Sequence, residues 1–284
     1  MRIQFKHVRV LAGFEFRQMV RSAPGILAAA FLFFPIAWLM SKLAGNAEVL
    51  NDIASGNISQ EWTFLLQAVK YLTDLDEGFM NRLFVEHSPF ITTMFVLTAF
   101  ATPFLTMIAA LDQNATDIGA KGIRFLLPRT SRDNLLLGRF LGTLLFWAML
   151  LALAGVAVTV MALVLDDVHG VSTVLIDGAR FTFGLVLVAT PFVAFMTICS
   201  VTTGNPLLSV TMGLGAYLAV FLMGGLGGWV HASLKVIRFI FPAPLRYDLM
   251  LGTWTNALVA TFAMLAYAVA FLVLAGWILR KRDL

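Results

Sequence analysis

The chain has 284 residues, of which 60% are hydrophobic. Only 13% are charged, whereas ordinary soluble domains carry about 25% charged residues. Together with a mean hydropathy of +0.87, this composition excludes a soluble globular domain and predicts an all-α protein that crosses a membrane several times. The net charge of +4 requires no nucleic-acid partner, because in a membrane protein an excess of Lys and Arg first reports orientation.

The first 24 residues predict a helix that lies flat on the membrane surface. Its bases recur at helical spacing and would line one face: Arg2, Lys6, Arg9, Arg17 and Arg21. A helix of this kind turns its bases toward anionic lipid of the inner leaflet. We interpret 1–24 as a retained interfacial helix, because no small-residue cleavage site follows the first apolar run. The alternative is a merely solvated basic leader.

Six segments are long and apolar enough to span a bilayer, which takes about 20 residues. They are 25–43, 90–111, 140–165, 181–203, 206–228 and 257–279. A short turn separates the fourth from the fifth, where Asn205 can cap a helix and Pro206 can occupy its first position. We therefore expect one transmembrane domain over 1–284, with an extracytoplasmic loop at 44–89.

Charge distribution predicts the orientation of the spans. The loop at 44–89 is acidic, whereas the N-terminal helix, the 112–139 connection and the C-terminal tail are basic. By the positive-inside rule, both termini and the 112–139 connection are cytoplasmic. The segment 229–256 would lie outside, yet it is basic and too apolar for a solvated loop, so we expect it to re-enter the bilayer or lie along its surface.

The connection between the second and third spans predicts a cytoplasmic docking element. Its first part, "DQNATDIGAKGIRFLLP", begins with acids and ends with bases, which suits a helix dipole, and Pro128 ends it. A second helix begins near Ser131, a plausible N-cap, and continues into the third span. A simple connecting loop needs neither part. The alternative is a basic loop that only sets orientation.

The spans carry few groups capable of chemistry. We predict no catalytic, metal or cofactor site, because no ionisable residue falls near mid-bilayer and the histidines are not spaced as metal ligands. The single cysteine, Cys199, allows no disulfide within the chain. There is also no P-loop motif. If the chain transports a substrate, we expect its energy to come from a partner.

The stretch "GIRFLLPRTSRDNLLLGRFLG" resembles the segment that follows the second span of ABC-2-type exporter permeases. The matching positions are Asp112, Asp117, Gly122, Leu126, Leu127, Pro128, Ser131, Arg132, Leu136, Leu137, Gly138 and Arg139. Lys121 departs from the family, which often has an acid before the glycine, and Arg139 replaces the usual lysine. The "PRTSR" elbow is one residue longer than the commonest spacing.

This resemblance implies the permease subunit of an ABC exporter that is not itself an enzyme. Two copies, expected as a homodimer, would associate with two cytoplasmic ATPase subunits, which would bind ATP and Mg. It also implies a bacterial inner membrane. The residues expected to couple to the ATPase are Asp112, Asp117, Lys121, Gly122, Arg124, Phe125, Pro128 and Arg132. The glycine pairs at 138/142 and 224/228 predict close helix packing or dimerisation.

Three functions are compatible with these features, and two of them differ in the substrate. An apolar bundle with aromatic edges suggests a hydrophobic or amphiphilic substrate. A permease for metal-centre maturation of the copper-site type is the second candidate, with which 13 methionines are compatible. The third is a non-transporting membrane scaffold whose basic connection recruits a cytoplasmic protein.

Overall fold

The computed structural model describes residues 4–55, 85–120, 130–230 and 232–282. Within these ranges every regular element is a helix, and six helices are long and apolar enough to cross a membrane, which confirms the all-α polytopic fold. They are α2 (Ala23–Ala44), α6 (Pro89–Ala109), α9 (Arg132–Leu165), α10 (Val171–Thr203), α11 (Pro206–Val230) and α13 (Trp254–Lys281).

Two of the spanning helices extend well beyond their apolar segments. α9 begins at Arg132, which confirms the predicted helix that starts near Ser131 and continues into the third span, whereas α10 begins at Val171 rather than near 181. With 34 and 33 residues and about 1.5 Å of rise per residue, each is roughly 50 Å long. This exceeds the hydrocarbon thickness of about 30 Å, so the polar turns at their ends extend beyond the membrane core.

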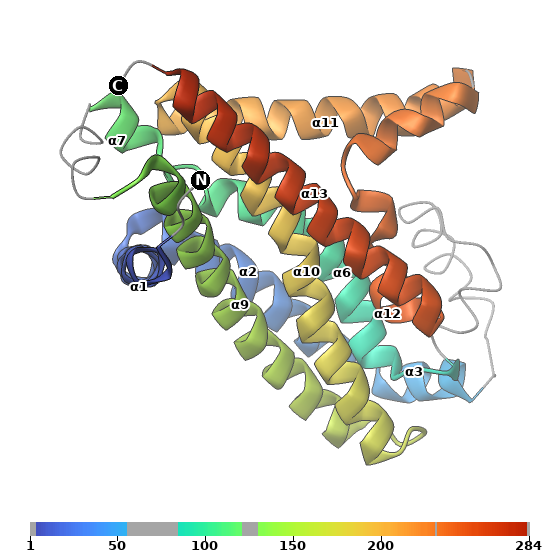
Figure 1. Ribbon diagram of the computed structural model, residues 1–284. Coiled ribbons are helices and arrows are strands. Elements are labelled where there is room, and N and C mark those ends of the chain that lie inside the picture. The colour runs from blue at the N-terminus through green and yellow to red at the C-terminus, as the bar shows by residue number, and fades with distance from the viewer. Residues whose placement is uncertain (1–3, 56–84, 121–129, 231, 283–284) are drawn as a thin grey trace.

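Both ends of the described chain meet at one end of the bundle, together with the connection between α6 and α9 (Figure 1). The backbone N–H of Gln4 donates to Asn134 Oδ1 at 3.1 Å, and the Arg282 guanidinium donates to the carbonyl of Val201. We call this the terminal end, and the opposite end the distal end. The predicted cytoplasmic location of the terminal end stays a prediction.

The helix α10 forms the centre of the bundle. It packs against α6, α9, α11 and α13, and 83% of its most apolar window is buried. In contrast, α2, α11 and α13 each expose large apolar side chains, as Phe34, Leu207 and Phe262 do. Such outward faces suit contact with lipid.

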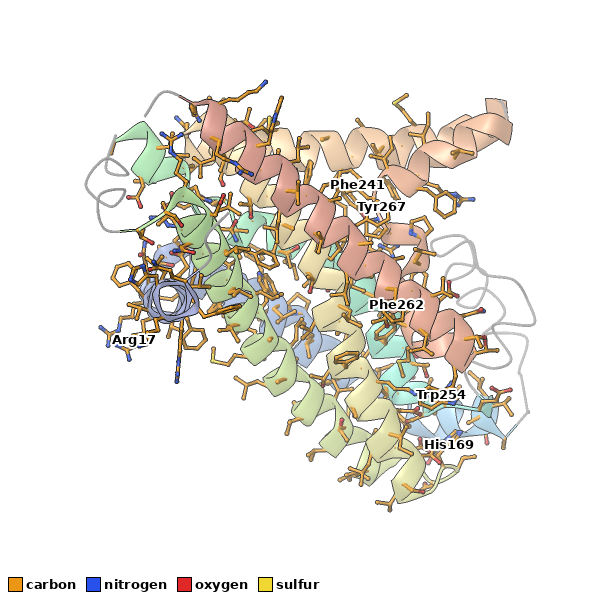
Figure 2. The ribbon with its side chains drawn as sticks, viewed as in Figure 1. Arg17, His169, Phe241, Trp254, Phe262 and Tyr267 are labelled. Atoms are coloured by element: carbon orange, nitrogen blue, oxygen red, sulfur yellow. The ribbon has the colours of Figure 1, made fainter. Side chains whose placement is uncertain are left out.

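The helix α1 (Phe5–Arg21) lies across the bundle and is seen nearly end-on in Figure 1, while α9 runs in the plane of the view. Its buried face packs against Gly138 and Gly142 of α9. The four described bases of the predicted basic face, Lys6, Arg9, Arg17 and Arg21, are exposed, and Arg17 points away from the bundle in Figure 2. Arg2 lies outside the described residues.

The glycine pair 138/142 therefore serves packing within one chain. A Cβ added at Gly142 would lie 2.5 Å from Glu15 Cβ. Gly224 likewise lets α11 approach the backbone of Arg238.

The segment before α13 folds back into the bundle, as the sequence indicated. It contains η2 (Ala232–Ile240), η3 (Ala243–Arg246) and α12 (Asp248–Leu251). The Phe241 ring lies 4.9 Å from the ring of Phe195 and 6.2 Å from that of Phe271, both well inside their helices. Figure 2 labels Phe241 and Tyr267 where this re-entrant segment meets α13.

Candidate functional site

One buried arginine fixes the start of the α6–α9 connection. The Arg139 side chain is 10% exposed; its Nη1 donates to the carbonyl of Gln113 at 2.5 Å, and its Nη2 donates to the Asp117 carboxylate. Asp117 belongs to α7 (Ala115–Gly119), the short helix that opens the connection. A planar guanidinium can hold two acceptors at once in a fixed geometry. Arg139 therefore couples α7 directly to α9.

The same connection is also fixed to α10. Thr197 Oγ1 donates to Gln113 Oε1 at 2.8 Å, and Asn114 Nδ2 donates to Ser200 Oγ at 3.4 Å. The turn that follows α10 passes against α7 at Gly204, whose φ of +65° falls in the left-handed region that favours glycine. The part of the connection up to residue 119 is thus fixed to two long helices, α9 and α10.

Arg132, a predicted coupling residue, has an internal role at the terminal end. Its Nη1 lies 2.9, 3.1 and 3.3 Å from the carbonyl oxygens of Leu279, Arg280 and Arg282. The last carbonyls of a helix lack partners within the helix, and a cation there also complements the helix dipole. Arg132 therefore joins α9 to the end of α13, while its predicted contact with a partner stays a prediction.

The other predicted coupling residues divide into two groups. Asp112 Oδ1 accepts the backbone N–H of Thr116 at 3.1 Å and so holds the first turn of α7, and the Asp117 side chain is 39% exposed. The rest lie outside the described residues: Lys121, Gly122, Arg124, Phe125 and Pro128. Their contact with an ATPase stays a prediction.

A buried acid, which sequence reasoning missed, adjoins Arg139. Glu15 of α1 is 6% exposed. Burial raises the pKa of Glu15 to about 7, Arg139 opposes this rise, and the charge of Asp112 adds to it. Its only signal in the sequence is a single acid within a basic helix. α1, α9 and the connection therefore meet in one cluster of acids around one arginine.

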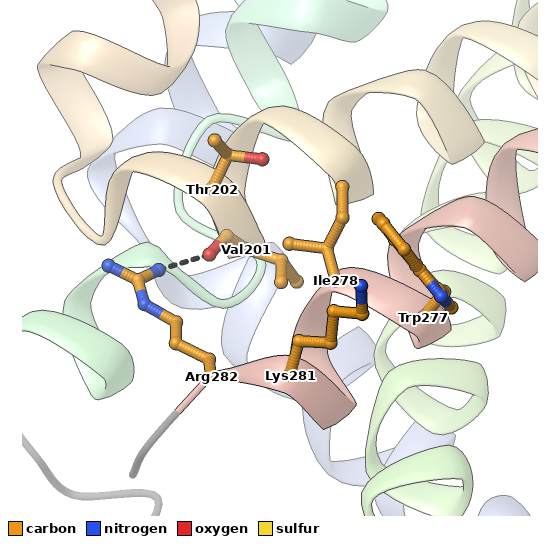
Figure 3. Close-up of a pocket in the computed structure, with 6 residues that line it drawn as sticks. All are labelled: Val201, Thr202, Trp277, Ile278, Lys281 and Arg282. Atoms are coloured by element: carbon orange, nitrogen blue, oxygen red, sulfur yellow. Dashed lines mark hydrogen bonds between the residues drawn. The ribbon is translucent and has the colours of Figure 1, made fainter.

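A hollow of about 280 Å³ opens at the terminal end, between the ends of α10 and α13 (Figure 3). Its lining residues are Val201, Thr202, Trp277, Ile278, Lys281 and Arg282. The Lys281 Nζ lies 3.9 Å from the centre of the Trp277 ring. Trp together with Lys is typical of the membrane–water interface.

The distal end carries a buried carboxylate in the stretch between the predicted third and fourth spans. Because α10 begins at Val171, Asp177 lies inside the helix and is 1% exposed. It accepts the backbone N–H of Ser88 at 2.9 Å and pairs with His87 Nδ1 at 2.9 Å. In the ranges that the structure describes, no group of three or more His, Cys, Asp or Glu could hold a metal ion.

A buried cation of the re-entrant segment was also not recognised. Arg246 was counted among the bases of an outer loop, yet it is 4% exposed. Sequence reasoning recognised that this segment was too apolar for a loop but could not place its side chains.

Comparison of the sequence with protein-family models and with curated proteins finds no match. The chain is a multi-pass membrane protein. Any finer function depends on the sequence motif and on the geometry of the terminal end.

Proposed function

We propose that this chain is the membrane-spanning permease subunit of an ATP-driven ABC exporter of the ABC-2 type. It moves a hydrophobic or amphiphilic substrate by alternating access, as a homodimer bound to two cytoplasmic ATPase subunits. The terminal end faces the cytoplasm of a bacterial inner membrane. The proposal begins from the resemblance of the α6–α9 connection to the family motif.

The observation that carries the proposal is the double anchoring of this connection. Arg139 ties α7 to α9, and Thr197 ties Gln113 to α10. A displacement of α7 by a partner would therefore pass directly to both long helices, α9 and α10. A coupling element between an ATPase and a transport pathway needs this property.

The exposed bases of α1 also support the proposed orientation. Lys6, Arg9, Arg17 and Arg21 face away from the bundle at the terminal end, where anionic lipid of a cytoplasmic leaflet would attract them. Exposed aromatic side chains beside them, such as Phe5 and Phe14, suit insertion at the same surface.

The proposal is tested by purification from native membranes in mild detergent, followed by an ATPase assay. We expect an ATP-binding subunit to co-purify, and Phe125→Ala or Arg124→Glu to release it or to uncouple hydrolysis from transport. Arg180→Glu is the matched control, because it reverses one base at the distal end, where Arg180 packs over the Trp254 ring at 4.2 Å.

Two results would overturn the proposal. One is a chain that purifies without any ATPase; the other is an ATPase whose retention and coupling are the same in the Arg124→Glu, Phe125→Ala and Arg180→Glu variants. If a different cytoplasmic protein co-purifies and depends on Arg124, the chain is a scaffold.

A further inference from the structure

A buried arginine of the re-entrant segment lies among aromatic rings. The guanidinium carbon of Arg246 lies 5.2 Å from the centre of the Phe100 ring and 4.7 Å from that of the Tyr247 ring. Tyr217 is close enough to interact electrostatically with the same guanidinium. The site thus draws on α6, α11 and the re-entrant segment.

The charge lies near mid-height of the bundle. Phe100 falls near the middle of α6, and Tyr217 near the middle of α11. A charged side chain at such a depth is costly, by about 2.5–3.5 kcal/mol even on insertion scales, and is commonly retained for function. Arg246 therefore calls for a partner that offsets this cost.

The polar atoms of the site are all able to donate hydrogen bonds. Arg246 Nε and Nη1 and the hydroxyls of Tyr217 and Tyr247 are buried, and among the described residues none makes a hydrogen bond of ordinary length and angle, although both hydroxyls lie near the guanidinium. Over the same ranges no carboxylate forms an ion pair with Arg246. Four donors around one positive charge favour an anion, and two guanidinium N–H groups suit the paired oxygens of a phosphate or carboxylate.

We propose that Arg246, Tyr217 and Tyr247 bind the anionic group, a phosphate or a carboxylate, of an amphiphile whose apolar part lies among the surrounding aromatic rings. Tyr217 alone packs edge-on against Phe104, Phe192 and Phe241, with ring centres 5.1, 5.4 and 5.5 Å apart. These rings offer an apolar surface beside the charge, as pockets for amphiphilic ligands commonly do.

The bilayer is the route to this site. α11 diverges from α10 and α13 in Figure 1, and the re-entrant segment folds back along it. Residues on the outer face of α11, such as Leu218, Phe221 and Leu222, are exposed. A sideways displacement of α11 would open Arg246 to lipid. That the bound amphiphile is the exported substrate rests on the proposed function, whereas the binding itself can be measured without any ATPase.

The test uses the purified full chain in phosphatidylcholine nanodiscs with radiolabelled dodecyl phosphate as the probe. We expect saturable binding, displaced by unlabelled dodecyl phosphate and by dodecanoate. Dodecyl maltoside and dodecyltrimethylammonium, which share the tail but lack the negative charge, should compete at least about tenfold more weakly. Inorganic phosphate should also fail to compete, because it lacks the apolar part. Equal competition by all four amphiphiles, or by inorganic phosphate, would overturn the proposal.

Variants assign the binding to the site. Arg246→Gln should weaken binding about tenfold or more, the loss expected for a charged hydrogen-bonding group. Tyr217→Phe and Tyr247→Phe keep the rings, remove the hydroxyls and should each weaken it less. Arg180→Gln, which removes another arginine that packs on an aromatic ring, should bind within about twofold of the unmodified chain. If Arg246→Gln binds the probe as tightly as the unmodified chain, the probe binds at another site.

A stability measurement separates a binding role from a structural one. Removing a buried charge that lacks an ionic partner should leave folding intact or improve it, so Arg246→Leu should unfold at the same temperature or higher while losing the probe. If Arg246→Leu and Arg246→Gln both unfold at lower temperature, the arginine is structural and the proposal falls. If binding fails while an ATPase still co-purifies through Arg124, only this inference is lost.

Discussion

Arg132 Nη1 at the start of α9 donates to the carbonyl oxygen of Leu279 at the end of α13, at 2.9 Å, across 147 positions of sequence. The bond closes the terminal end of the bundle, because it joins the helix that follows the α6–α9 connection to the last helix of the chain. It also gives a predicted coupling residue a structural role that can be measured without a partner.

We expect Arg132→Ala to destabilise the chain. The substitution removes Nη1, which shares its two N–H groups among three carbonyls; a charge-assisted hydrogen bond is worth about 1.5–3 kcal/mol when buried and less here because the site is partly exposed. Thermal unfolding in detergent should show a lower midpoint. Arg17→Ala is the control, since Arg17 is exposed on α1 and should leave the midpoint unchanged. Equal midpoints for the two variants would contradict the capping role.

The features that the sequence predicted well are local ones. Ser131 was expected to cap a helix, and its Oγ accepts the N–H of Asn134 at 3.2 Å. Asn205 was expected to cap α11, and its Oδ1 accepts the N–H of Leu207 at 2.9 Å. Both caps, like the six apolar spans, depend on residues a few positions apart, so the pattern of side chains along the chain suffices to predict them.

The features that the sequence did not reveal depend on distant contacts. The burial of Glu15 follows from two glycines of α9 more than a hundred positions away, and Arg246 is buried by helices from across the chain. Charge counting uses only the sign of these two side chains and carries no information about their burial. A single sequence shows which residues are polar, but it does not show which helices will cover them.

The contact between α1 and α9 predicts opposite effects for two glycine substitutions. A Cβ at Gly142 would lie 2.5 Å from Glu15 Cβ and 2.7 Å from the carbonyl oxygen of Ala12, so Gly142→Ala should destabilise by about 1–3 kcal/mol. A Cβ at Gly13 meets nothing within 4 Å, and Gly13→Ala should stabilise by up to about 1 kcal/mol through helix propensity. Thermal unfolding and trypsin cleavage at Arg17 measure both. The packing of α1 on α9 is refuted if Gly142→Ala also stabilises.

The raised pKa of Glu15 predicts a stability that falls with pH. The carboxyl is protonated in the folded chain up to about pH 7, whereas in the unfolded chain it ionises near the ordinary glutamate pKa of 4.5. The folded state therefore holds more protons between these values, and stability is lost as pH rises from about 4.5 through about 7, by on the order of 3 kcal/mol.

Glu15→Gln should remove this pH dependence and raise the unfolding midpoint at pH 8. The midpoint is measured from pH 4.5 to pH 8 for both chains. Arg139 and Asp112 face the same carboxyl, so in Asp112→Asn the loss of stability should end at a lower pH and be smaller, because the substitution removes a charge that helps to raise the Glu15 pKa. A profile that is identical in the Glu15→Gln variant would assign the dependence to another group.

The buried carboxylate at the distal end predicts a graded loss of stability. Asp177→Ala leaves the buried backbone N–H of Ser88 without its acceptor, and an orphaned donor costs about 1–3 kcal/mol. Asp177→Asn keeps one carbonyl oxygen as an acceptor, and its stability should fall between that of Asp177→Ala and that of the unmodified chain.

The control is Asp52→Ala, which changes an exposed acid of α3 (Ala47–Ala54) at the same end. Unfolding midpoints should rank the unmodified chain and Asp52→Ala first, Asp177→Asn second and Asp177→Ala last. Equal midpoints for Asp177→Ala and Asp52→Ala would mean that Asp177 does not hold the start of α6 against α10.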